Sequence, residues 1–229
     1  MNLSKRKYAI IAGLSLILMA VLAGYAYGFV YGSLVFPGEG QKTLESIQSS
    51  IETFQSGIAA WIGIFILDIL VAWALHLFLK NVNLHLSQVT AALRILYAAV
   101  LGVAIYHQMA ALSMVSKEAA SSQILYELEA FEIIWSAGLI FFGLHLIGLG
   151  VLCWKAGFVP NFWGGILIFA GFCYSGIHLA KALFSEQIHQ IVQVEQVLSL
   201  PMAFAEIGLA IWLIWKGGRI PSHIKNLSQ

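Results

Sequence analysis

The sequence predicts an all-α membrane protein, a single integral membrane domain over residues 1–229 that is built as a bundle of six transmembrane helices. Hydrophobic residues make up 60% of the chain, charged residues only 10%, and the mean hydropathy is +0.85. Such a composition leaves too little polar surface for a soluble globule of this length. In addition, six segments are apolar over the roughly 20 residues that a helix needs to cross the hydrocarbon core. These segments are residues 8–36, 57–79, 91–113, 134–153, 162–184 and 200–215.

The first segment follows a basic start, MNLSKRK, which is also typical of a secretory signal. The apolar region of a signal is only ~7 to 15 residues long, whereas residues 8–36 form an apolar-to-small run of 29 residues. The run therefore predicts an uncleaved first helix. None of the six segments alternates polar and apolar residues as membrane-spanning strands do.

The connections between the segments are of two kinds. Those after the second and fourth segments are short, which predicts two tight antiparallel helix pairs. The other three are longer and carry apolar residues at helical spacing; the first of them has Leu44, Ile47, Ile51 and Phe54. These loops predict amphipathic helical segments, which either lie on the membrane or extend the spans outward.

The distribution of basic residues predicts the orientation, because Lys and Arg stay in cytoplasmic segments. With the N-terminus inside, the outer loops hold only Lys42 and Lys117. We therefore expect a multi-pass protein of the cell membrane with both termini cytoplasmic. Its expected partner is the lipid bilayer, no nucleic acid is expected, and the oligomeric state is left open. The cytoplasmic basic residues are Lys5, Arg6, Lys7, Lys80, Lys155, Lys216, Arg219 and Lys225.

Several ionisable residues lie inside the apolar segments. Such a residue costs a few kcal/mol or more unless it faces the bundle interior, pairs or meets water, so each is a candidate site residue. Small residues share the helix faces of some of them, which predicts that these side chains point into the packed interior. The ionisable residues are Asp68, Arg94, His107, His145, His178, Lys181 and Glu206.

Depth along the helices predicts how these side chains are layered. His107, His178 and Glu206 lie ~9 Å from the outer ends of their spans, and Asp68 and His145 lie ~16 Å in, at 1.5 Å per residue. This layering predicts a polar site that runs from the outer face to the midplane. We expect His145, Glu206, His178 and His107 to bind the ligand, and the sequence assigns no catalytic residue.

Two specific contacts are predicted within this site. If the third helix begins by about Leu84, the Arg94 side chain reaches Asp68, and the two form a structural ion pair, since either charge alone would be expensive to bury. His145 and Glu206 are expected to meet directly or through one water.

Four stretches carry a resemblance to a known family: LDILVAWALHLFLKNVN, AALRILYAAV, GLHLIGLGVLCWKAGFVPNFWGGILIFAGFCYS and AEIGLAIWLIWKGG. Together they resemble a bacterial family of six-helix integral membrane proteins known as a domain of unknown function. The resemblance covers most of the chain from the second span onward. It supplies no established activity, and His107 and His178 match no family pattern. The family positions that it implies are Asp68, Arg94, His145, Pro160, Tyr174 and Glu206.

Three functions are compatible with these residues, and the cofactor is left open. The first is a bundle that binds or passes a small ligand, proton or ion from the outer side, with His145 and Glu206 as polar contacts. The second is a zinc-dependent intramembrane hydrolase of a lipid-like substrate, with Asp68, His107, His145 and His178 as metal ligands, although no HExxH spacing is present. The third is a haem or quinone redox protein that uses His107 and His178 as axial ligands. An accessory protein, or polar residues that only hold the helices together, are the remaining alternatives.

Overall fold

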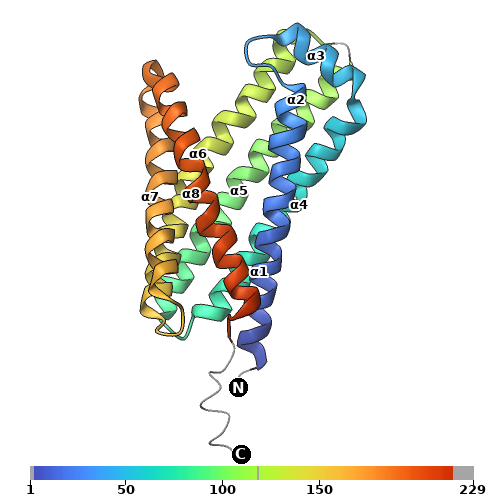
Figure 1. Ribbon diagram of the computed structural model, residues 1–229. Coiled ribbons are helices and arrows are strands. Elements are labelled where there is room, and N and C mark those ends of the chain that lie inside the picture. Colours follow the sequence, from blue (N-terminus) through green and yellow to red (C-terminus); the bar gives the residue numbers. More distant parts are fainter. Residues whose placement is uncertain (1–2, 118, 219–229) are drawn as a thin grey trace, which may run out of the picture.

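Six long apolar helices run between the two ends of the molecule in the computed structural model, which describes residues 3–117 and 119–218 (Figure 1). No β-strand occurs in these two ranges, so the predicted all-α bundle of six spans is confirmed. The first span is composite: α1 (Leu3–Ala23) continues into the π-helical stretch η1 (Gly24–Tyr31) and a last turn, α2 (Gly32–Leu34). The other five spans are α4 (Ile51–Leu79), α5 (Leu84–Val115), α6 (Ser121–Lys155), α7 (Asn161–Leu183) and α8 (Ile188–Trp215).

The spans form a ring in chain order. Each long helix packs against the next one along the chain, and α8 closes the ring by packing against both α7 and α1. Large apolar side chains are exposed on the outside of this ring, as Ile66 and Phe172 illustrate. An outward apolar surface on every helix is what a surrounding bilayer requires, and it makes the molecule a multi-pass membrane protein.

Glycines bring α6 and α7 into backbone contact. A Cβ on Gly171 would lie 2.5 Å from the carbonyl oxygen of Gly143, and a Cβ on Gly150 would lie 2.7 Å from that of Gly164. The glycines repeat every seven residues on each helix, so the two faces meet at two levels. Small residues of this kind allow membrane helices to approach closely.

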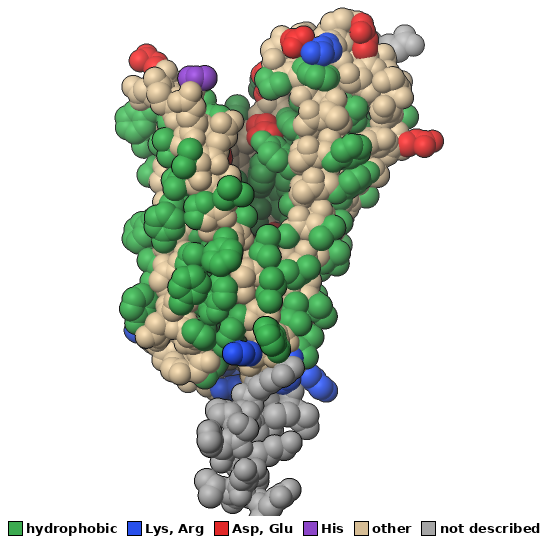
Figure 2. Space-filling model, viewed as in Figure 1, with side chains coloured by type: hydrophobic (Ala, Val, Ile, Leu, Met, Phe, Trp, Pro, Cys, Tyr) green, Lys and Arg blue, Asp and Glu red, His purple; other side chains and the backbone are tan. Residues whose placement is uncertain are grey.

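At one end of the molecule, α1 and α8 are held together by Arg6. Its guanidinium donates to the carbonyl oxygens of Leu213 (3.0 Å) and Ile214 in the last turn of α8, and to that of Gly217 (2.7 Å) just after the helix ends. Helix C-termini leave carbonyl groups without intrahelical donors, which a cation satisfies well. The start of the first span and the end of the last span therefore lie on the same side of the membrane. We call this end of the molecule the basic end, because most of the visible Lys and Arg lie there (Figure 2).

The opposite end carries the long loops, and we call it the acidic end because the visible Asp and Glu lie toward it (Figure 2). The first loop folds into a separate amphipathic helix, α3 (Gly40–Ser49), which buries Thr43 and Ile47 and packs on α6. In the second and third loops, the amphipathic residues are instead the first turns of α6 and of α8, which follows the short 3₁₀ turn η2 (Ser185–Gln187). The helices are therefore longer than the apolar segments, because their amphipathic turns continue the same helix beyond the apolar core.

Candidate functional site

A cavity of about 440 Å³ lies at the centre of the ring, and side chains from all six spans line it. Figure 2 shows the hollow between α8 on one side and α1 with η1 on the other, open at the acidic end. At the basic end the ring is closed, since α1 and α8 meet there through Arg6 and through Gly13. Most of the lining side chains are aliphatic or aromatic. The cavity is thus an apolar chamber with a small number of polar groups.

Three aromatic rings from different spans form one wall. Tyr27 of η1 lies 4.9 Å from Trp135 of α6 between ring centroids, and Trp135 lies 5.0 Å from Trp61 of α4. Both contacts are edge-to-face, an arrangement favoured by the aromatic quadrupole. The indole nitrogen of Trp61 is buried and has no acceptor within the described ranges. We call these three residues the aromatic wall.

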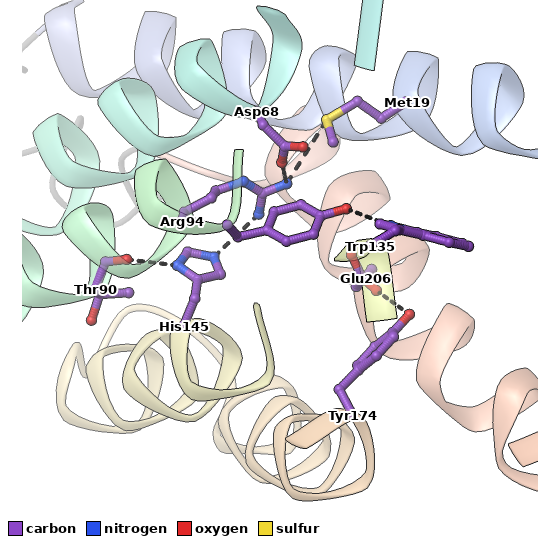
Figure 3. Close-up of polar contacts among 9 residues, drawn as sticks. Met19, Asp68, Thr90, Arg94, Trp135, His145, Tyr174 and Glu206 are labelled. Atoms are coloured by element: carbon purple, nitrogen blue, oxygen red, sulfur yellow. Dashed lines mark hydrogen bonds and ion pairs between the residues drawn. The ribbon is translucent and has the colours of Figure 1, made fainter. Parts of the chain in front are cut away.

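Behind the lining, Asp68, Arg94 and His145 form a buried polar cluster (Figure 3). Arg94 Nη2 lies 2.8 Å from Asp68 Oδ1, and the two side chains are 1% and 0% exposed. Arg94 Nη1 lies 3.1 Å from His145 Nε2, and His145 Nδ1 lies 2.8 Å from the carbonyl oxygen of Thr90. The predicted partners Asp68 and Arg94 are therefore in contact, and α5 does begin at Leu84, as that contact requires.

The contacts of His145 define its protonation. A carbonyl oxygen can only accept a hydrogen bond, so Nδ1 must carry the proton that is donated to Thr90. A guanidinium can only donate, so Nε2 must be the acceptor toward Arg94. His145 is therefore the neutral Nδ1–H tautomer, with both ring nitrogens in use.

Glu206 faces the cavity from α8 and does not contact His145. Its Oε1 accepts a hydrogen bond from the Tyr174 hydroxyl of α7 at 3.0 Å (Figure 3). The expected direct contact between His145 and Glu206 is not formed, for a physical reason, and their contact through one water stays a prediction. Because α7 packs between α6 and α8, its tyrosine reaches Glu206 first, while α5 supplies both partners of His145.

A second polar group lies nearer the acidic end. His178 Nδ1 is 2.8 Å from the hydroxyl of Ser136, and His178 Nε2 is 3.6 Å from Glu195, which also pairs with Lys181 at 2.6 Å. His178 and Glu195 line the cavity. These contacts tie α6, α7 and α8 together beside the opening.

His107 lies apart from the cavity lining. Its Nδ1 is 2.6 Å from Glu127 Oε2, in a contact between α5 and α6. The four residues considered as zinc ligands therefore occupy separate contacts rather than surrounding one point: His107 with Glu127, His178 with Ser136, and Asp68 and His145 on either side of Arg94. Over residues 3–117 and 119–218, no three His, Cys, Asp or Glu side chains are grouped closely enough to share a metal ion.

Sequence reasoning missed the aromatic wall and Tyr97. Tyr97 lines the cavity, and its hydroxyl accepts a hydrogen bond from Trp135 Nε1 at 3.3 Å. Burial of an ionisable residue costs free energy and so marks it as a candidate site residue, whereas aromatic residues are common anywhere in a span. The stretch GYAYGFVY, with three tyrosines in eight residues of the first span, was a signal that could have been used.

The fold and the cavity together define a class: a six-span integral membrane protein with a central chamber that is open at one end. Comparison with known proteins gives the family. Residues 11–217 match the family described as "Domain of unknown function (DUF4386)", and the chain belongs to it, as its four motifs predicted. An "Uncharacterized protein" of the archaeon Archaeoglobus fulgidus is 32% identical over 168 residues, which cover 72% of this chain and 88% of the relative. The relative is archaeal, so the expected bacterial character of the family is not confirmed. No solved structure matches the chain.

Proposed function

We propose that the protein binds a small, largely apolar molecule in its central cavity, from the extracytoplasmic side of the membrane. The observation that carries the proposal is the cavity itself, at about 440 Å³ and lined by all six spans. Ligand pockets are typically of roughly 300–1,000 Å³, mostly apolar, with a few convergent polar groups. Here those groups include Glu206 and Tyr174, which share a hydrogen bond, together with Tyr97, His178 and Glu195.

The lining favours a molecule over a bare proton or inorganic ion. An ion needs several oxygen or nitrogen ligands around one point, whereas Glu206 has the Tyr174 hydroxyl as its hydrogen-bond partner and most of the remaining lining is apolar. A ligand with an apolar body would contact the aromatic wall and still reach Glu206. Passage of a proton or ion from the same side is the second candidate, and it would use the polar groups without filling the chamber.

The charge distribution supports the sidedness. The cavity opens at the acidic end, and most of the visible Lys and Arg side chains lie at the closed end (Figure 2). Because basic segments stay in the cytoplasm, we propose that the opening lies on the extracytoplasmic side and both termini in the cytoplasm of a cell-membrane protein.

The test is to fill the cavity and measure binding of a neutral apolar probe. Ala203 of α8 lines the cavity and is exposed, so Ala203→Phe should occupy ligand space. The matched control is Ala99→Phe on α5, which is also exposed but lies outside the cavity lining. The probe is N-phenyl-1-naphthylamine, titrated into protein in lipid nanodiscs and followed by energy transfer from tryptophan.

We expect saturable one-to-one binding in the unmodified protein and in Ala99→Phe, above the signal of empty nanodiscs. Binding should weaken at least tenfold in Ala203→Phe. Equal binding by both variants, or no saturable binding by any of them, would reject the cavity as a binding site.

A further inference from the structure

The charge facing the cavity is unbalanced. Glu206 lines the chamber, and no Lys, Arg or His within the described ranges forms an ion pair with it. The closest candidate by position, Arg94, lies behind the lining and is already paired with Asp68, with His145 as its second partner. The Tyr174 hydroxyl donates one hydrogen bond to Glu206 but carries no charge. Arg94 attracts Glu206 without forming an ion pair with it, so the group of Asp68, Arg94 and Glu206 carries one more negative than positive charge once Glu206 is ionised.

An unpaired charge at membrane depth is expensive unless a partner of opposite sign meets it. The two polar pairs nearest the opening do not supply that partner, because Lys181 is held by Glu195 at 2.6 Å, and His178 is held between Ser136 and Glu195. A cationic ligand would supply it. The acidic end around the opening has the right sign to attract such a ligand, as Figure 2 shows.

The apolar lining also suits a cation. Aromatic faces attract positive charge, by about 0.5–2 kcal/mol for each well-placed ring. The guanidinium carbon of Arg94 already lies 5.3 Å from the ring centroid of Phe142, so one ring of the lining already contacts a cation. On the cavity side, Tyr27, Trp61 and Trp135 present further rings, and the thioethers of Met19 and Met202 are polarisable.

The cavity is also accessible from the side. Tyr27 of η1 and Ala203 of α8 are both exposed and both line the chamber, and Figure 2 shows the hollow between these two elements. Pro201 lies within α8 at this level and lacks the amide hydrogen of a normal helical residue, so the helix is one hydrogen bond weaker here. In a bilayer the hollow between α8 and η1 faces the hydrocarbon, so a ligand that dissolves in lipid can reach the cavity through it.

We infer that the ligand is a lipophilic organic cation, whose charge pairs with Glu206 and whose apolar body packs on the aromatic wall. The inference rests on the function proposed above and adds the sign of the charge and the lipid solubility of the ligand. A neutral apolar molecule or a lipophilic anion would occupy the same chamber without pairing with the negative charge of Glu206.

The experiment uses two probes of the same shape and opposite charge, tetraphenylphosphonium and tetraphenylborate. Each is titrated into protein in phosphatidylcholine nanodiscs, and the partition into empty nanodiscs is subtracted. We expect tetraphenylphosphonium to bind saturably, at least tenfold more tightly than tetraphenylborate, and to displace N-phenyl-1-naphthylamine. Glu206→Gln should weaken the cation at least tenfold and leave the neutral probe almost unchanged. Glu129→Gln, which removes an exposed acid on α6 at the same end, is the control.

The outcomes separate the two proposals. If both charged probes bind equally, or if Glu206→Gln leaves cation binding intact, the cation inference is wrong while the cavity still binds the neutral probe. If none of the three probes binds saturably, both proposals fail. If Glu206→Gln does not fold, the comparison of the two charged probes in the unmodified protein still decides the sign of the charge.

Discussion

Neutralising one member of the Asp68–Arg94 pair should destabilise the protein strongly, although the substitution changes the side-chain volume little. Both side chains are almost completely buried, and their charged atoms lie 2.8 Å apart. Asp68→Asn keeps the volume and removes the negative charge, so Arg94 keeps its contacts with His145, the Met19 sulfur and the Phe142 ring but loses its counter-charge. Arg94→Gln leaves Asp68 without its cation, and it also takes away the donor that His145 Nε2 accepts from.

The distance between the two charged groups sets the size of the expected change in the free energy of unfolding. At 2.8 Å and an effective dielectric constant of about 20, the attraction between unit charges is about 6 kcal/mol. Part of this is offset by the desolvation that the pair suffers on burial, so removal of one partner should lower the free energy of unfolding by about 3–5 kcal/mol. The double variant Asp68→Asn with Arg94→Gln carries no orphaned charge. Its loss should fall short of the sum of the two single losses by about 2–3 kcal/mol.

The assay is unfolding by sodium dodecyl sulfate from mixed micelles, followed by helical circular dichroism, for the four members of the cycle. Glu129→Gln, which removes an exposed carboxylate, is the control and should change the free energy of unfolding by less than about 0.5 kcal/mol. Strictly additive losses in the cycle would refute the coupling. Asp68 would then have no structural need of Arg94, and a role in ligand chemistry would become the better explanation of its burial.

Two further predictions concern packing and sidedness. Gly171→Ala would place a Cβ 2.5 Å from the backbone of α6, so the same assay should show a loss of about 1–3 kcal/mol. Gly176→Ala, on the same helix with nothing within 4 Å, should be neutral or gain up to about 1 kcal/mol, and the reverse order would refute the close crossing. In a cysteine-free background, cysteines at Ser49 and Gln190 should react with an impermeant maleimide on intact cells, whereas Asn161→Cys should react only after permeabilisation. Reversed labelling would place the cavity mouth in the cytoplasm.

Depth was the part of the site that the sequence could predict. The position of a residue along its span follows from counting, so Asp68 and Arg94 could be matched once the start of the third helix near Leu84 was inferred. The partners of Glu206 could not be matched in this way. Its depth fits several side chains, and the choice of Tyr174 depends on the rotation of α8 and on the position of α7 beside it.

The sequence alone determined that this chain crosses the membrane six times as helices and buries several ionisable groups. Each span satisfies its own backbone hydrogen bonds and meets the lipid independently of the others, so composition and length are sufficient to predict it. The tertiary structure alone decided that the six helices surround a chamber, and that Tyr27, Trp61 and Trp135 share one wall of it. Helix contacts depend on where glycines permit close approach, as between α6 and α7, and on which neighbour closes the ring. These are joint properties of several helices, because packing in lipid is governed by fit between surfaces rather than by the hydropathy of any one segment.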